Sequence, residues 1–388
     1  MAESALVTDG LWRKSLSAIR SLGKAGLDVA VMGDSRFTTG FWSRYTRERI
    51  IAPTAANDHE GFGHALLSAL RRKPGRILFP MEDASLMWVS EHRDEILSLA
   101  RTLLPPEESL RIAQDKGATL EIARQLGLPC PRSFESKDAD EFAKHVGALE
   151  PGSFVVKPRS GSGSAGVAYG EYQPTEAWKK HWERFGPMLI QERVPPQGRG
   201  RGVSLLFDRN GECVAEFAHE RIQQYPNSGG PSTDRQSVHA PELVQWSIQL
   251  LKRLSWQGIA MVEWKEDPRD GQPKLMEINP RFWGSLELAC RSGVDFPALF
   301  ARAASGESAG PPPTYPAGVR CRWMIPGEIL RYLTQPRAER ESLCRFMKGL
   351  PGLAEEWDPQ DLQGAIATIV CTGAYAINPR YWKYLRRG

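Results

Sequence analysis

Short apolar runs alternate with helix-like periods over the first part of the chain, from residue 1 to about 105. Leu16, Ile19 and Leu22 recur at helical spacing, and a second helix is expected around 65–70. The apolar runs between these helices are short enough to be buried strands, at 5–8, 29–32, 50–51 and 77–79. This alternation predicts an α/β domain built on a parallel sheet. Ligands of such sheets bind at the carboxyl ends of the strands, where the polar pairs are Asp9-Gly10, Asp34-Ser35 and Glu82-Asp83.

The pattern changes after Pro105-Pro106, where strand-like runs follow one another with turns between them. Helices are expected over about 115–126, 242–254 and 285–292. Asp208-Arg209-Asn210-Gly211 lies between two alternating runs and predicts a hairpin. The other expected strands are 153–158, 167–169, 188–194, 203–207, 214–218, 259–262 and 276–279. We therefore expect two α+β lobes after the N-terminal domain.

The boundaries predicted from these changes give four parts. The first is an α/β substrate-binding domain, and the second is a lobe with a glycine loop. The third is a lobe with a metal site, and the fourth, after Pro311-Pro312-Pro313, is a small C-terminal extension without a readable motif. Their limits are 1–105, 106–190, 191–310 and 311–388.

Composition narrows the class of protein. Of the 388 residues, 41% are hydrophobic and 25% are charged, which is typical of a globular protein. The 50 basic and 46 acidic residues leave a net charge of +4, too small to favour nucleic acid as a partner. The six cysteines form no CxxC pair, and no apolar run is long enough to span a membrane. We expect a cytoplasmic protein with neither nucleic acid nor membrane as a partner.

A candidate metal site lies in the run Met276-Glu277-Ile278-Asn279-Pro280-Arg281. Alternate residues of a strand share a face, so Glu277 and Asn279 point the same way, and a neighbouring strand delivers Glu263. Two carboxylates and an amide oxygen suit Mg²⁺ or Mn²⁺, which keep waters and bridge phosphates. Arg281, just beyond, is available for an anionic group. The alternative is a solvated strand edge with two ordinary acids.

A glycine-rich loop supplies a candidate phosphate site. Its members are Ser160, Gly161, Ser162, Gly163, Ser164 and Gly166. The G-x-G-x-x-G spacing is followed by a strand rather than a helix, which argues against dinucleotide binding. A glycine hairpin between two strands can instead close over phosphates, and Lys157 on the entering strand can reach one. A flexible hairpin without a ligand is the alternative.

Three segments together resemble the ATP-grasp superfamily, whose typical members are carboxylate–amine or carboxylate–thiol ligases. They are 276–281, Val155-Val156-Lys157-Pro158 with its glycine loop, and 189–194. The order matches over roughly residues 1 to 305 and implies two lobes that grip ATP between them. One feature departs from the family: the acidic residue expected shortly after 194 for the ribose is missing from 197–203. Ribose recognition therefore stays open.

The resemblance also implies a role for each candidate residue. Lys116, which local sequence alone would leave as a surface lysine, and Lys157 would contact the nucleotide phosphates, and the loop 160–166 would close over them. Gln191, Glu192, Arg193 and Val194 would form the hinge whose backbone meets the adenine. Glu263, Glu277 and Asn279 would hold one or two Mg²⁺ ions, and the catalytic candidates are Arg281 and Lys157. The second substrate would meet His219, Arg221 and a loop containing Gly230 and Ser232.

These roles lead to an ATP- and Mg²⁺-dependent, ADP-forming ligase as the expected activity. It would activate a small carboxylate as an acyl phosphate and join it to an amine. Two alternatives stay open, a small-molecule kinase on the same fold and a non-catalytic nucleotide sensor. The expected partners are small molecules, and a homodimer is compatible with the sequence.

Overall fold

The N-terminal domain is built on a parallel sheet, as the alternating pattern predicts. The computed structural model describes residues 3–161, 166–170, 174–226, 229–308 and 310–377. Its five-stranded sheet has the order β3-β2-β1-β4-β5, with all neighbours parallel. The strands are β1 (Ser4–Val7), β2 (Asp28–Gly33), β3 (Thr46–Ile51), β4 (Arg76–Phe79) and β5 (Ala100–Arg101). The strand ends at Asp9 and Glu82 therefore lie at one edge of the sheet.

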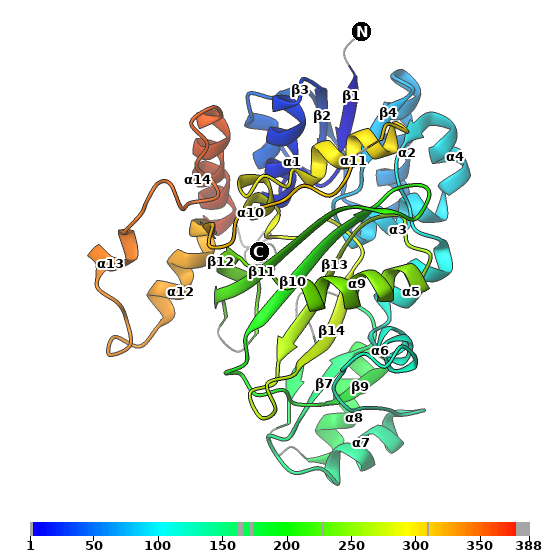
Figure 1. Ribbon diagram of the computed structural model, residues 1–388, viewed down its shortest axis with the longest axis vertical. Coiled ribbons are helices and arrows are strands. Elements are labelled where there is room, and N and C mark those ends of the chain that lie inside the picture. The colour runs from blue at the N-terminus through cyan, green and yellow to red at the C-terminus, as the bar shows by residue number, and fades with distance from the viewer. Residues whose placement is uncertain (1–2, 162–165, 171–173, 227–228, 309, 378–388) are drawn as a thin grey trace.

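Helices cover both faces of this sheet (Figure 1). Leu16, Ile19 and Leu22 bury one side of α1, which explains the helical spacing seen in the sequence. The elements are α1 (Arg13–Lys24), η1 (Thr39–Trp42), α2 (His59–Arg72), α3 (Asp83–Glu91) and α4 (Arg93–Leu99). The helices α5 (Glu107–Gln114) and α6 (Lys116–Gln125) then lead to the lobes.

The first lobe is a four-stranded antiparallel sheet of order β6-β9-β7-β8. Its strands are β6 (Ser133–Glu135), β7 (Phe154–Pro158), β8 (Ala168–Tyr169) and β9 (Met188–Glu192). Two helices, α7 (Ala139–Gly147) and α8 (Thr175–Phe185), pack on it through Phe142 and Trp178. The glycine loop joins β7 to β8, so the predicted strand–loop–strand order is confirmed.

The second lobe is a larger antiparallel sheet of order β14-β13-β10-β11-β12-β15. Its first five strands along the chain are β10 (Gly200–Phe207), β11 (Cys213–Gln224), β12 (Ser232–Ser237), β13 (Gly258–Glu266) and β14 (Pro273–Asn279). Val203, Leu205 and Val262 face α9 (Pro241–Arg253). Phe217 and Met261 face the other way, toward α10 (Leu286–Arg291) and α11 (Phe296–Ala304).

One core joins this lobe to the N-terminal domain. Val7 and Phe79 from the parallel sheet belong to the same buried cluster as Phe217, Met261 and Phe300. Phe79 and Phe300 lie with their ring centroids 4.9 Å apart. The second lobe is therefore packed firmly against the carboxyl-terminal half of the parallel sheet.

The segment after Pro313 is part of the same packed structure as the second lobe. Its strand β15 (Arg320–Arg322) pairs with β12 and completes the six-stranded sheet. The remaining elements are η2 (Met324–Glu328), α12 (Ile329–Thr334), α13 (Leu343–Met347) and α14 (Leu362–Ile377). Figure 1 shows α14 beside α1, and α14 also contacts η1. Within the described ranges no helix combines the length and the hydropathy that a membrane span requires.

Candidate functional site

The three predicted metal ligands lie together at the end of the β13–β14 hairpin. Glu263 is the register partner of Glu277, and Asn279 is that of Met261. The Asn279 amide Nδ2 donates to Glu263 Oε1 at 3.2 Å and to Glu277 Oε1 at 3.4 Å. The sequence prediction that these side chains share one face is therefore confirmed in geometry. Their role as metal ligands stays a prediction.

Two cations face this pair of carboxylates. Arg221 Nη2 lies 2.6 Å from Glu263 Oε1, and Lys116 Nζ lies 3.5 Å from Glu277 Oε2. Burial raises the pKa of Glu263, and the neighbouring Glu277 adds to the rise, whereas Arg221 opposes it. A site in which two acids disfavour each other's charge attracts a cation.

The chemistry of this donor set fits Mg²⁺. Among the residues with described positions, no group of three or more His, Cys, Asp or Glu side chains is placed to hold a metal. The set here is two carboxylates and one amide, which is enough for Mg²⁺ because that ion keeps several waters. Rotation of the Asn279 amide would turn its oxygen, in place of its nitrogen, toward the carboxylates.

Lys157, on strand β7 of the first lobe, lies near the carboxylates Glu277 and Glu263. Its Nζ donates to Gln191 Oε1 at 2.8 Å, across the β7–β9 pair. The pKa of Lys157 is lowered to about 8, chiefly by desolvation and also by the nearby Lys116 and Lys265, while Glu277 opposes the shift. Lys157 is therefore a half-buried cation near Glu277, and it loses its charge more easily than an exposed lysine does.

Lys116 joins the glycine loop to the metal-site carboxylates. Its Nζ donates to Gly161 O at 2.7 Å, and Ser160 is exposed beside it. Arg159, at the base of the loop, pairs with Asp115 at 2.7 Å and with Glu135 at 2.7 Å. At the far end Gly166 has φ of +73°, a left-handed conformation that favours glycine. Ser162, Gly163 and Ser164 lie outside the described residues.

The predicted hinge, residues 191–194, begins in the last two residues of β9 and continues past its end. Gln191 is buried within the sheet, and the Arg193 N–H donates to Ser153 O at 2.9 Å. Glu192 is held by Arg132 and Arg269. The Val194 carbonyl accepts from Lys265 Nζ at 3.2 Å. The structure thus places Val194 beside Lys265 on β13, and the contact of this segment with adenine stays a prediction.

Arg281 connects the metal-site strand to the N-terminal domain. Its Nε lies 2.9 Å from Asp83 Oδ2, at the start of α3, and this carboxylate together with Glu82 raises the pKa of Arg281 despite burial. Lys14 Nζ lies 2.5 Å from Glu82 Oε1 and donates to Phe282 O at 3.0 Å. The polar end of β4, which the sequence marks as a ligand edge, therefore meets the end of β14.

Of the residues predicted for the second substrate, Arg221 contacts the site carboxylates, and the others have partners elsewhere. Arg221 reaches Glu263 in the site. His219 is buried and its Nε2 lies 3.2 Å from Ser285 Oγ, and burial lowers its pKa to about 3. Gly230 precedes β12 and packs against the Tyr225 carbonyl. The prediction that Ser232 belongs to a loop is wrong, because it begins β12 and its hydroxyl donates to the carbonyls of Gln223 and Asp234.

Two lysines of this region were missed in the sequence. The sequence could have identified Lys265 as a site residue, because it lies two residues after Glu263 and therefore shares its strand face. The sequence could not have identified Lys14, because a lysine in the first turn of an amphipathic helix is usually solvated. Its burial depends on Glu82 and Phe282, which come from distant parts of the chain.

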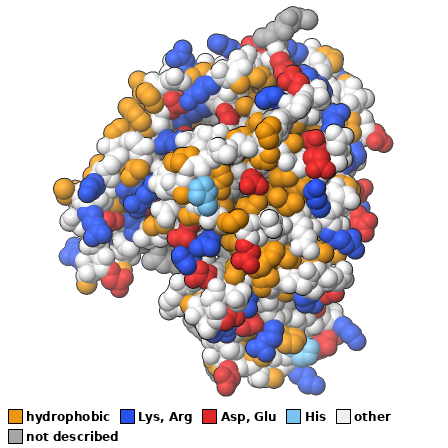
Figure 2. Space-filling view, viewed as in Figure 1, with side chains coloured by type: hydrophobic (Ala, Val, Ile, Leu, Met, Phe, Trp, Pro, Cys, Tyr) orange, Lys and Arg blue, Asp and Glu red, His pale blue; other side chains and the backbone are white. Residues whose placement is uncertain are grey.

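Basic and acidic side chains are interspersed on the face of the molecule seen in Figure 2, without a dominant charge. This distribution agrees with the small net charge of the chain.

Comparison with known proteins identifies the fold. The family model described as "ATP-grasp in the biosynthetic pathway with Ter operon" matches residues 185–325. Biotin carboxylase from Campylobacter jejuni superposes with a TM-score of 0.63 at 16% identity, over 79% of this chain and 71% of that one. N5-carboxyaminoimidazole synthetase from Staphylococcus aureus, complexed with ADP, gives 0.63 at 15% identity over 81% of each chain. L-amino acid ligase from Bacillus licheniformis gives 0.59 at 16% identity, over 80% and 77%.

The chain has the ATP-grasp fold, and the resemblance to the ATP-grasp superfamily seen in the sequence is confirmed. A comparison with curated protein sequences finds no match. At the identities of the solved structures the likeness establishes the architecture. The chemistry has to be argued from the side chains of this chain.

Proposed function

We propose that this protein is an ATP- and Mg²⁺-dependent, ADP-forming ligase that activates a small carboxylate as an acyl phosphate and joins it to an amine. The observation that carries the proposal is the meeting of Glu263, Glu277 and Asn279 with Lys116 and Lys157 across the two lobes. Two carboxylates that suit a metal thus lie beside two lysines that suit phosphates. The proposal includes a cytoplasmic location and leaves a homodimer open.

The chain's own residues account for the phosphoryl step. A carboxylate is a poor electrophile, and transfer of the terminal phosphoryl group of ATP to its oxygen gives an acyl phosphate with a good leaving group. Lys157 and Lys116 would hold the phosphate oxygens, and Arg281 would face the transferred group. Mg²⁺ bound by Glu263, Glu277 and Asn279 would neutralise charge on those oxygens. Such transfer depends on positioning and charge more than on covalent help from the protein.

The second step requires that water stay out. The amine nitrogen attacks the acyl carbon, the bond from that carbon to the phosphate oxygen breaks, and inorganic phosphate leaves. The amine loses a proton in the process. Because water would hydrolyse the acyl phosphate, a loop has to cover it, and the β7–β8 loop held to Lys116 is the candidate cover.

Product analysis tests the proposal. ADP and phosphate release would be followed with Mg²⁺-ATP and a pool of amino acids and organic acids, with and without free amines. Turnover that requires both a carboxylate and an amine is the expected result. ADP without free phosphate, together with a stable phosphorylated product, would replace the ligase by the kinase. Tight ATP binding without turnover across the pool would favour the sensor.

A further inference from the structure

The helix α14 turns an apolar face to the solvent. Its large exposed side chains are Leu362, Ile366, Ile369, Val370 and Ile377. These positions recur every three or four residues and therefore form one stripe along the helix. α14 carries no charged residue, and Gln363, in its first turn, is its one exposed polar side chain. The outer face of a surface helix is normally polar, so a stripe of this kind is expected to have a partner.

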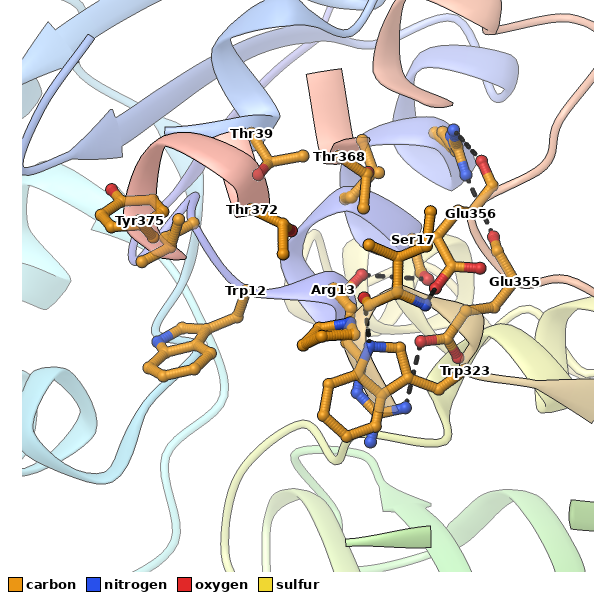
Figure 3. Close-up of a pocket in the computed structure, with 15 residues that line it drawn as sticks. Trp12, Arg13, Ser17, Thr39, Trp323, Glu355, Glu356, Thr368, Thr372 and Tyr375 are labelled. Carbon is orange, nitrogen blue, oxygen red and sulfur yellow. Dashed lines mark hydrogen bonds and ion pairs between the residues drawn. The ribbon is translucent and has the colours of Figure 1, made fainter. Parts of the chain in front are cut away.

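The opposite face of α14 is already packed against the protein. Cys371 and Tyr375 are buried in a small cluster against which Leu11 packs. Thr372 and Tyr375 line the cavity between α14 and the start of α1 (Figure 3). The Tyr375 hydroxyl also lies 3.2 Å from Ser35 Oγ, just after β2. α14 therefore cannot turn its apolar stripe inward without breaking these contacts.

Aromatic and basic side chains flank α14 on the side of η1, which contacts it. Phe37 shortly precedes η1 and Trp42 ends it, and 41% and 46% of their surfaces are accessible. The Trp42 Nε1 donates to Arg36 O at 3.0 Å, and the Arg49 guanidinium lies 5.2 Å from the Trp42 ring centroid. Both arginines are exposed. Aromatic rings beside basic side chains are typical of segments that lie at the headgroup level of a membrane.

The acids nearest in the sequence do not balance this positive charge. Within residues 35–51 and 358–377 the acids are Glu48, Asp358 and Asp361, and each is already held in an ion pair. Their partners are Arg76, Lys24 and Arg20. The charges of Arg36 and Arg49 therefore remain available to an anionic partner.

An anionic lipid surface complements this side of the protein better than a second copy does. A two-fold contact uses the same patch on both partners, so a second copy would bring the same arginines and no further acid from these segments. Anionic phospholipid headgroups supply the opposite charge. The sequence after α14, residues 378–388, adds four Lys or Arg and no Asp or Glu, so the net charge at this end of the chain has the same sign.

We propose that α14 docks on the surface of a bilayer that contains anionic phospholipid. The helix lies in the plane of the interface, where Ile366, Ile369 and Val370 enter the acyl boundary and Arg36 and Arg49 meet the headgroups. The expectation from the sequence that a membrane is not a partner rested on spanning runs, and a helix that lies on the surface does not span. The inference goes beyond the proposed function and does not depend on it, because vesicle binding requires neither ATP nor Mg²⁺.

The test is cosedimentation of the full-length protein with lipid vesicles in the absence of ATP. One vesicle set is phosphatidylcholine alone, and in the other about a quarter of the lipid is phosphatidylglycerol. We expect the partition coefficient to be at least about tenfold higher on the anionic vesicles, because each arginine near the surface adds its own attraction. Added salt should reduce that difference, since it screens the headgroup charge.

Matched variants separate the apolar contribution from the charged one. Ile366→Glu should lower the partition coefficient on anionic vesicles at least about tenfold, because a buried apolar side chain is lost. Leu97→Glu, at an exposed leucine of α4, is its control and should bind like the wild type. Arg49→Gln should weaken binding to anionic vesicles about fivefold, whereas Arg253→Gln, at the exposed end of α9, should not. Circular dichroism checks that all four variants fold.

Three results would overturn the proposal: no binding to anionic vesicles, equal binding to neutral ones, or binding that Ile366→Glu leaves unchanged. Sedimentation velocity without lipid tests the second copy. A dimer of the wild type that Ile366→Glu makes monomeric, without vesicle binding, would show that α14 joins two copies instead. Ligase turnover enters none of these measurements, so a failure of the proposed reaction and a failure of membrane docking are distinguishable.

Discussion

Lys157 is a half-buried ammonium whose pKa is lowered to about 8, because desolvation disfavours its charge. The lysine is protonated below that pH and neutral above it, so its attraction for phosphate is lost as pH rises. We expect kcat/KM for ATP to fall as pH increases through about 8, since this quantity reports ionisation in the free enzyme. Steady-state rates at constant ionic strength measure it.

The variant Lys157→Ala tests whether the fall in kcat/KM near pH 8 comes from Lys157. It should raise KM for ATP sharply and remove the fall near pH 8. Lys14, whose pKa burial also lowers to about 8, is the competing source. If the fall in kcat/KM near pH 8 persists in Lys157→Ala, the group that titrates is not Lys157. If KM for ATP is unchanged in this variant, Lys157 does not contact the phosphates.

Glu277 is the second residue that tests the site. Glu277→Gln removes one negative charge from the metal ligands, and we expect it to abolish turnover and to weaken Mg²⁺-dependent ATP binding. The fold should persist because the side chain is partly exposed. Glu266→Gln, on the adjoining strand, is a matched control. Turnover like that of the wild type in Glu277→Gln, with circular dichroism unchanged in both variants, would contradict the metal assignment.

At the residue scale, the sequence predicts side chains whose placement follows from strand geometry. Glu263, Glu277 and Asn279 meet because alternate residues share a face and the two strands are neighbours. It does not predict partners that come from elsewhere. The contacts of Arg221 with Glu263 and of Arg281 with Asp83 depend on tertiary packing, and no local pattern marks either pair.

At the element scale, Gly202 sets how closely β10 approaches β11. It is the register partner of both His219 and Glu263, and a Cβ atom there would lie 2.3 Å from the His219 ring. We expect Gly202→Ala to lower the free energy of unfolding by about 1–3 kcal/mol, because the buried ring has little room to move. Urea denaturation measures it.

Gly373 provides the comparison for that substitution. It lies inside α14, and an added Cβ atom there would meet nothing within 4 Å. Gly373→Ala should therefore raise stability by roughly 0.5–1 kcal/mol through helix propensity alone. If both variants changed stability alike, close packing at Gly202 would not be the cause.

Elements with an apolar pattern could be predicted, and those held by ion pairs could not. The run Ser232–Ser237 consists entirely of polar residues, yet it forms β12 and is largely buried. Its burial is stabilised by Arg320, which pairs with Asp234, and by Glu355, which pairs with Arg235. Both partners lie more than 80 residues away, so the polar run resembled a loop in the sequence.

At the scale of the whole molecule, Glu355 links three regions of the chain. It pairs with Arg13 of α1 and with the fully buried Arg235 of β12, while itself belonging to the C-terminal segment. Burial lowers the pKa of Arg235 to about 10, so the charge of this guanidinium is costly in its place. Removing the carboxylate would leave a buried cation without its partner, a change that costs roughly 3–5 kcal/mol.

We therefore expect Glu355→Ala to lower the free energy of unfolding by about that amount, although the residue lies outside the proposed metal and phosphate site. Glu339→Ala, at an exposed position of the same segment, should leave it nearly unchanged. Because one buried cluster spans the parallel sheet and the second lobe, both regions should lose structure in the same urea transition. A Glu355→Ala protein as stable as the wild type would mean that the C-terminal segment covers the body of the protein without holding it together.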